Sequence, residues 1–215
     1  MNDKLIIIGE NSRLTKSLNS ISNNIFIVKK EFYKNWNCKN SFSDLLDSFE
    51  IDKNDSILIN KAIIDPSLSI NEINKWNYQF QKYIIEALEI NNYKNRVYTT
   101  GSIFEKSKIN NKYLNSKRNL SNYILQTNFN SVRPCHLRFH TLFGIDFPPY
   151  NMFLGQIFTS IKKKSIFQMS DGDQLRQYHH YDEVSKYLLN IFNDFKSDNK
   201  IIEITGKEWI KLIDL

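Results

Sequence analysis

The chain has 215 residues, of which 41% are hydrophobic and 13% aromatic, so it can bury a continuous core as one domain or as one domain with a small appendage. Its net charge of +6 does not gather into the face of arginines and stacking aromatics that a nucleic-acid-binding protein needs. The two cysteines, Cys38 and Cys135, lack C-x-x-C spacing, which argues against a zinc site and suits a reducing compartment. No apolar run approaches the ~20 residues that cross a bilayer, and no signal-peptide cleavage pattern is present. We therefore expect a cytoplasmic protein with neither a nucleic acid nor a membrane as partner.

The first half of the chain alternates short apolar runs with helical patterns. A run of four consecutive apolar residues is typical of a parallel strand that is buried on both faces. Apolar residues spaced three and four apart indicate helices between these runs. We expect strands at Leu5–Ile8, Ile25–Val28 and Ser56–Ile59, and helices at 14–21, around 42–49 and at 73–90.

The same alternation continues to Gly144 and then changes. A strand is expected at 96–100, a helix at 113–125, and strand structure within 131–139 that ends at 142–144. Beyond Pro148 and Pro149 the sequence predicts a helix over 151–161, short strands near 166–169 and 201–205, and a helix starting at Asp182. Strands and helices that alternate with short connections predict an α/β fold with a parallel sheet covered by helices.

The turn from the first strand into the first helix is where a Rossmann-like, doubly wound parallel sheet holds a dinucleotide, because free N–H groups at the helix start attract the pyrophosphate. The usual fingerprint has three glycines. Here Gly9 supplies the first, and Ser12 and Thr15 stand at the other two positions. Lys29 and Lys30 end the second strand, where an acidic residue would bind the ribose of NAD, and cations there suit the 2′-phosphate of NADP. An ordinary strand-to-helix turn and solvated lysines are the alternatives that these residues leave open.

Tyr113 and Lys117 are four residues apart and therefore share one helix face. A nearby ammonium favours phenolate and is expected to lower the pKa of the tyrosine, which then exchanges a proton with a hydroxyl or a carbonyl. An exposed pair on a helix surface is the alternative interpretation of this spacing.

Three segments and one further residue place this pair in a wider pattern. Residues 97–104 resemble the motif V-x-S-S-x-x-V-Y, 137–144 resemble L-R-x-x-N-x-Y-G, and 172–184 are similar to G-x-Q-x-R-D-F-x-H-V-D-D-V. Through nearly its whole length the chain resembles the extended short-chain dehydrogenase/reductase family, and within it the nucleotide-sugar epimerases, dehydratases and reductases. Asn77 matches a helix asparagine that braces the active site in this family.

This resemblance implies roles for individual residues. Tyr113 and Lys117 would be the catalytic pair, and Thr100 the hydroxyl that orients the substrate. Ser102 and Arg176 would bind the substrate, Arg176 through a diphosphate that suits its guanidinium fork. The implied cofactor-binding residues are Gly9, Ser12, Arg13, Leu14, Lys29, Asn60, Ala62, Asn77 and Lys117.

The resemblance also implies the organisation of the molecule. A dinucleotide-binding domain over 1–144 would carry NADP or NAD, and a small portion over 145–215, interleaved with it, would bind a nucleotide sugar. Family members often dimerise, which suggests a homodimer through helices near 73–90 and 113–125. His180 and Asp182 are expected to brace the start of a helix, and no metal site is expected, because adjacent histidines on a strand point to different sides.

Two departures from the family pattern bear on the activity. Thr100 and Tyr113 are separated by thirteen positions, which is shorter than the usual interval in the family. Glu105 is the only acidic residue in 104–112, without the Asp-Glu pair of a dehydratase. We therefore favour reduction of a keto-sugar for surface polysaccharide biosynthesis, with a nucleotide-sugar epimerase or a non-catalytic dinucleotide-binding protein as alternatives.

Overall fold

A computed structural model describes residues 4–36, 42, 48–52, 54–150, 152–193 and 200–215. Most of the helix predicted around 42–49, and Cys38 as well, lie outside these residues. No helix in the described part of the chain combines the length and the apolarity needed to span a membrane.

Six parallel strands form the central sheet. In sheet order they are β2 (Ile25–Val28), β1 (Leu5–Ile8), β3 (Ser56–Ile59), β4 (Arg96–Ser102), β5 (Arg133–Phe139) and β9 (Ile201–Ile204). The chain steps from β1 outward to β2 and returns to the other side of β1 with β3, so the direction of winding reverses between β1 and β3. This reversal confirms the predicted doubly wound, Rossmann-like sheet, and ligands in such sheets bind at the carboxyl ends of the strands beside the switch point.

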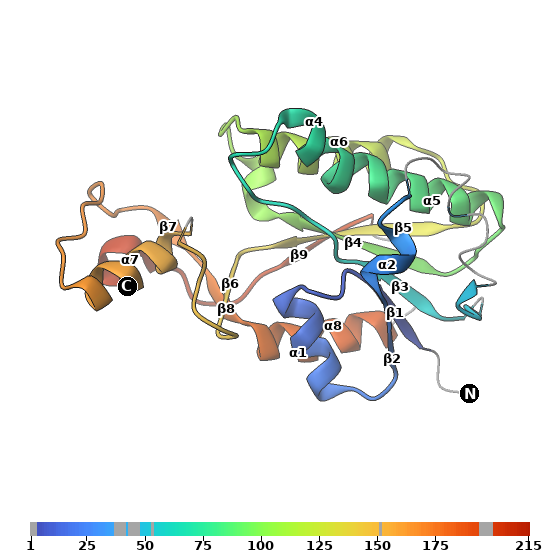
Figure 1. Ribbon diagram of the computed structural model, residues 1–215, viewed down its shortest axis with the longest axis horizontal. Helices are drawn as coiled ribbons and strands as arrows, with labels where there is room; N and C mark the ends of the chain where they lie inside the picture. The colour runs from blue at the N-terminus through green and yellow to red at the C-terminus, as the bar shows by residue number, and fades with distance from the viewer. Residues whose placement is uncertain (1–3, 37–41, 43–47, 53, 151, 194–199) are drawn as a thin grey trace.

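Helices cover both faces of this sheet (Figure 1). α1 (Arg13–Ile21) and α8 (Tyr181–Asn193) lie on one face. The other face carries α6 (Lys112–Gln126) and one long helical segment, which consists of α4 (Ile70–Asn74), the π-helical turn η2 (Lys75–Gln79) and α5 (Phe80–Ile90). The long segment begins at Ile70 rather than at 73, because Ser69 and Glu72 form a capping box at its start. A single turn, α2 (Lys30–Tyr33), follows β2.

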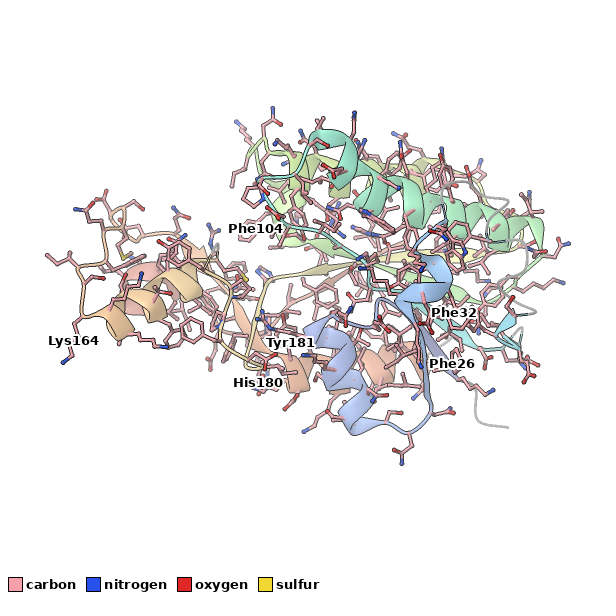
Figure 2. The ribbon with its side chains drawn as sticks, viewed as in Figure 1. Phe26, Phe32, Phe104, Lys164, His180 and Tyr181 are labelled. Carbon is pink, nitrogen blue, oxygen red and sulfur yellow. The ribbon has the colours of Figure 1, made fainter. Side chains whose placement is uncertain are left out.

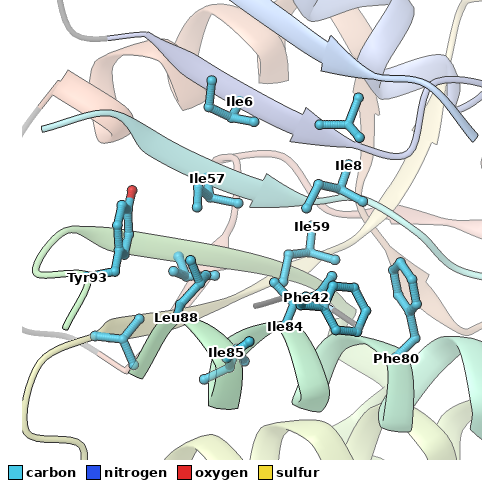
Figure 3. Close-up of a cluster of buried hydrophobic side chains, with 14 of the residues drawn as sticks. Ile6, Ile8, Phe42, Ile57, Ile59, Phe80, Ile84, Ile85, Leu88 and Tyr93 are labelled. Carbon is cyan, nitrogen blue, oxygen red and sulfur yellow. The ribbon is translucent and has the colours of Figure 1, made fainter. Parts of the chain in front are cut away.

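Alternation along the strands divides the core into two layers. Ile6 and Ile8 pack toward the α5–α6 face with Ile57 and Ile59, whereas Leu5 and Ile7 pack toward α1 and α8. Figure 3 shows the first layer, in which the strand isoleucines face Phe80, Ile84, Ile85 and Leu88 of α5. Burial on both faces explains why β1 is apolar throughout and why β3 is apolar after Ser56, and hence why their bounds could be predicted.

The chain after β5 builds a smaller region beside the sheet, with α7 (Phe153–Lys163) at its outer end (Figure 1). Two small sheets lie here: β6 (Thr141–Phe143) pairs with β8 (Tyr178–His180), and β7 (Leu175–Arg176) pairs with β10 (Ile210–Lys211). Single 3-10 turns, η3 (Ile103–Lys106) and η4 (Leu212–Asp214), complete the described elements. The strand predicted near 166–169 is wrong: these residues have no strand partner, and Ile166 is 91% exposed.

The last part of the chain returns to the main sheet. β9 pairs with β5, and α8 is joined to α1 by hydrogen bonds from Ser17 to Asp182 (2.8 Å) and from Ser185 to Ser17 (2.8 Å). His180 accepts a hydrogen bond from the Asp182 backbone N–H (3.3 Å) and so supports the start of α8. Residues from both 1–144 and 145–215 therefore build the main body, and the division at 144 stays a prediction.

Candidate active site

A cavity of about 440 Å³ opens at the carboxyl ends of β1, β3 and β4, beside the switch point of the sheet. Its wall also includes residues from the start of α6 and from the smaller C-terminal region. Figure 2 shows two wall residues, Phe104 and Tyr181, on the side of the main sheet that faces this region. Eight residues predicted from the sequence lie on this wall: Ser12, Leu14, Asn60, Ala62, Thr100, Ser102, Tyr113 and Arg176.

Gly9 shapes the turn after β1. Its φ of +133° is a backbone conformation that favours glycine, and a Cβ atom there would lie 2.3 Å from the Asn60 carbonyl oxygen. The hydroxyls at the other two fingerprint positions are used inside the turn: Thr15 donates to the Gly9 carbonyl (2.7 Å), and the Asn60 amide donates to Ser12 (2.7 Å). These bonds tie the turn to the end of β3, where further glycines would leave open space.

The start of α1 fits the pyrophosphate of a dinucleotide. Ser12 caps the helix by accepting from the Leu14 N–H (3.2 Å). Within the described residues, the backbone N–H groups of Arg13 and Thr15 have no acceptor, as is normal for the first turn of a helix. Thr15 is buried and neither residue lines the cavity, whose wall here is Ser12 and Leu14, but the positive end of a helix beside a cavity suits an anionic group.

Four predicted cofactor-binding side chains do not lie on the cavity wall: Arg13, Lys29, Asn77 and Lys117. The Arg13 guanidinium donates to the Phe147 carbonyl (2.9 Å) and lies 4.0 Å from Asp146, so it reaches toward the segment after β6. Lys29 is exposed at the end of β2 and precedes α2. The cofactor roles of these side chains stay predictions.

Tyr113 and Lys117 lie on one side of α6, which begins with Asn111 as its N-cap. Tyr113 is half-buried on the cavity wall, and its hydroxyl makes no hydrogen bond to any residue in the described part of the chain. Lys117 is 1% exposed, and its Nζ donates to the Thr100 carbonyl at 2.5 Å and lies 5.9 Å from the centre of the Tyr113 ring. The structure thus brings together the three residues predicted to be catalytic.

The pKa values of the pair differ from the sequence expectation. Burial raises the pKa of Tyr113, and the charge of Glu105 raises it further, so the predicted lowering is not seen. Burial lowers the pKa of Lys117 to about 8, although Glu105 opposes this shift. The physical reason is that burial penalises both charged forms, and the Lys117 ammonium is held at the Thr100 carbonyl rather than against the phenol. At neutral pH Tyr113 is therefore a proton donor.

Asn77 is buried in the π-helical turn and lies behind the cavity wall. Its side chain accepts from the Ile63 N–H (2.7 Å) and donates to the Ile63 carbonyl (2.9 Å) and to the Ser116 hydroxyl (3.1 Å). A π-helical turn inserts an extra residue into a helix and often occurs at functional sites. Asn77 thus braces the loop after β3 against the residue next to Lys117.

Arg176 and Ser102 lie at the end of the cavity nearest the C-terminal region. The Arg176 guanidinium is 4.4 Å from the centre of the Phe104 ring, and its Nη2 donates to Gln174 (2.5 Å). Arg176 also lines an adjoining cavity of about 420 Å³. The Ser102 hydroxyl caps the 3-10 turn that follows β4 by accepting from the Phe104 N–H (3.3 Å).

Sequence reasoning missed a buried group behind this wall, centred on Glu105 and His136. Glu105 is 5% exposed and His136 is fully buried, and their side chains are 3.1 Å apart. Burial works against ionisation of Glu105, but hydrogen bonds from His136 and the Ser102 N–H, with the charge of Arg138, hold its pKa at about 2. The S-x-x-E spacing of Ser102 and Glu105 is a capping-box signal that could have located the carboxylate.

No protein-family model matches the sequence, and no curated protein matches it at a significant level. Solved structures do match. The UDP-glucuronic acid 4-epimerase of Bacillus cereus, in complex with UDP-glucuronic acid and NAD, has a TM-score of 0.76 at 14% identity over 98% of this chain and 80% of that chain. A GDP-L-fucose synthetase of Naegleria fowleri has a TM-score of 0.71 at 12% identity over 99% of this chain and 80% of that one. The Bordetella bronchiseptica enzyme WbmG, in complex with NAD and UDP, has a TM-score of 0.71 at 12% identity over 98% and 74%.

The chain has the fold of these enzymes. At identities of 12–14% the likeness extends to the fold and not to the activity.

Proposed function

We propose that this chain is an NAD(P)-dependent oxidoreductase of the extended short-chain dehydrogenase/reductase kind, and that it reduces a keto group of a nucleotide-linked sugar. One observation carries the proposal: a single cavity wall joins the start of α1 to Thr100 and Tyr113, with Lys117 directly behind. The bound NAD, UDP and UDP-glucuronic acid in solved structures of the same fold support this choice of ligands.

The residues present fit a nicotinamide dinucleotide. The N–H groups of Arg13 and Thr15 would receive the pyrophosphate, with Asn60 and Ala62 beside it on the cavity wall. Lys117 has one hydrogen-bond acceptor among the described residues, so two of its three N–H donors are free for hydroxyls of the cofactor. When bound, the reduced nicotinamide would supply the hydride.

The chain itself supplies the proton and the orientation. The raised pKa of Tyr113, caused first by burial and then by Glu105, keeps the phenol protonated, so that it donates to the carbonyl oxygen of the sugar. Thr100, on the same wall, offers a second hydroxyl to that oxygen. Arg176, stacked over Phe104, would bind the diphosphate.

An epimerase is the second candidate, because one of the solved structures with this fold is a 4-epimerase. Epimerisation requires Tyr113 to act as a base in one half-reaction and as an acid in the other. The direction of its pKa shift favours the acid role, and reduction needs only that role.

The homodimer through the helices near 73–90 and 113–125 stays a prediction, which sedimentation velocity tests.

Turnover by wild type and by Tyr113→Phe tests the proposal. Oxidation of NADPH and NADH is followed with a panel of UDP-, GDP- and dTDP-linked keto-sugars. We expect Tyr113→Phe to lower kcat roughly 10²–10⁴-fold, the range typical of a lost general acid, while dinucleotide binding is retained.

Tyr187→Phe is the matched control, since Tyr187 is an exposed tyrosine on α8, and it should keep the wild-type rate. Near-wild-type turnover by Tyr113→Phe would show that the proton donor is a different group. Interconversion of UDP-sugars without net NAD(P)H oxidation would favour the epimerase.

A further inference from the structure

A chain of buried hydrogen bonds lies directly behind the cavity wall. The Thr99 hydroxyl is 2.7 Å from His136 Nδ1, and His136 Nε2 is 3.1 Å from Glu105 Oε1. The same carboxylate oxygen accepts from the Ser102 N–H (2.7 Å), and its other oxygen accepts from Arg138 Nε (3.1 Å). The Glu105 carboxylate thus accepts three hydrogen bonds from groups on β4 and β5.

The protonation state of this group follows from its contacts. An ionised Glu105 only accepts, so His136 Nε2 must carry a hydrogen and Nδ1 must accept from the Thr99 hydroxyl. Burial lowers the pKa of His136, which keeps the ring neutral at pH 7 in this tautomer. The group therefore carries one negative charge, on Glu105, whose ion-pair partner is Arg138.

The backbone of β4 is shaped to admit this pair. A Cβ atom on Gly101 would lie 2.1 Å from His136 Nε2 and 2.4 Å from Glu105 Oε1, so the two side chains pack against bare backbone. Gly101 is the residue between Thr100 and Ser102, which both line the cavity. Arg118, next to Lys117 on α6, donates to the Glu105 carbonyl (2.8 Å) and fixes the 3-10 turn to that helix.

We propose that Glu105 and His136 are positioning residues of the site: together they hold the Thr100–Ser102 backbone in place, and the Glu105 carboxylate, bonded to the Ser102 N–H, is the negative charge that balances the buried Lys117 ammonium at the Thr100 carbonyl. This inference rests on the proposed function only in one respect, which is the proposed binding of cofactor hydroxyls by Lys117. The Thr100 carbonyl accepts from Lys117 and the Ser102 N–H donates to Glu105, so Lys117 and Glu105 both bond to the backbone of the same short segment.

The charges around Lys117 support this role. Burial alone lowers its pKa, and Glu105 is the group that raises it, for a net value of about 8. The other titratable groups near it are Tyr113 on α6, neutral His136 on β5, and Arg138, whose charge acts on Glu105 and His136. Without Glu105 the pKa of Lys117 falls further, and less of the ammonium is present at neutral pH.

An NMR titration of Lys117 in the protein without added ligand tests the electrostatic part. The protein is labelled with ¹³C at lysine Cε, and the Lys117 signal is identified by its loss in Lys117→Arg. We expect Glu105→Gln to lower the pKa of Lys117 by about one unit or more, and Glu105→Asp, which keeps the charge, to restore most of it.

Glu203→Gln is the matched control. Glu203 also contacts Arg138 (3.7 Å) but lies on β9, so its loss should leave the pKa of Lys117 unchanged. An unchanged pKa in folded Glu105→Gln overturns the proposal. This titration needs no turnover, so its result is independent of whether the proposed activity is correct.

Hydrogen exchange tests the positioning part, and it decides the matter if Glu105→Gln does not fold. In His136→Gln we expect the amides of 100–102 to exchange about tenfold faster or more, while those of β1 keep the wild-type rate. Unchanged exchange at 100–102 would show that the pair does not hold this segment.

Discussion

Lys117 and Lys29 are both proposed cofactor-binding residues, but they lie in very different environments. Lys117 is buried, and its environment lowers its pKa to about 8, so its charge depends on pH near neutrality. Lys29 is exposed at the end of β2, and its proposed role is attraction of the 2′-phosphate that distinguishes NADP from NAD. Only the first role depends on the packed interior of the protein.

Substitution of Lys29 should therefore change cofactor preference without changing the fold. We expect Lys29→Gln to weaken NADPH binding roughly threefold to tenfold and to leave NADH binding unchanged, because only NADPH carries the extra phosphate. Fluorescence titration with each cofactor measures both affinities. Lys34→Gln, at the other end of α2, is the control and should alter neither. Equal loss of NADPH and NADH affinity in Lys29→Gln would refute the assignment.

For individual residues, local patterns in the sequence predicted part of the site and missed the rest. The Tyr113–Lys117 spacing gives a shared helix face by geometry alone, and the cavity wall confirms the proximity of Thr100. The contact of Glu105 with His136 joins residues 31 positions apart on different elements, and no local pattern encodes it. The pKa of Tyr113 was predicted in the wrong direction, because spacing says nothing about burial.

The elements differ in how strongly the sequence specifies them. β1, β2 and β3 have the predicted bounds, because a run of three or four apolar residues between polar turns leaves little freedom. β7 and β10 have two residues each and arise from tertiary contact, so no periodicity marks them. The apolar residues near 166–169 predicted a strand. They do not form one, because they have no partner strand in the folded chain.

The π-helical turn between α4 and α5 gives a prediction about stability. The buried Asn77 side chain makes three hydrogen bonds there, and Asn77→Ala removes the side-chain partner of both the N–H and the carbonyl of half-buried Ile63. We expect a loss of about 2 kcal/mol in the free energy of unfolding, measured by urea denaturation. Asn71→Ala, at an exposed position on α4, should cost about 0.5 kcal/mol or less. Equal stability of the two variants would mean that Asn77 does not brace the loop.

At the level of the whole molecule, the strand order of the sheet determines where the site lies. Reversal of winding between β1 and β3 brings the start of α1, the end of β3 and the end of β4 around one cavity. The alternation of strands and helices predicted a parallel sheet, but the order of its strands depends on which neighbours pair, and that information is not local. The similarity to solved nucleotide-sugar enzymes agrees with this topology while the sequence identity is only 12–14%.

We propose that the cavity beside Gly9 and Tyr113 binds a nicotinamide dinucleotide. Titration of the pure protein into NADPH and into NADH, followed by nicotinamide fluorescence, measures this binding. We expect a saturable change in intensity or wavelength with at least one of them, and Tyr113→Phe should preserve that change. No fluorescence change with either dinucleotide would show that the cavity does not bind one.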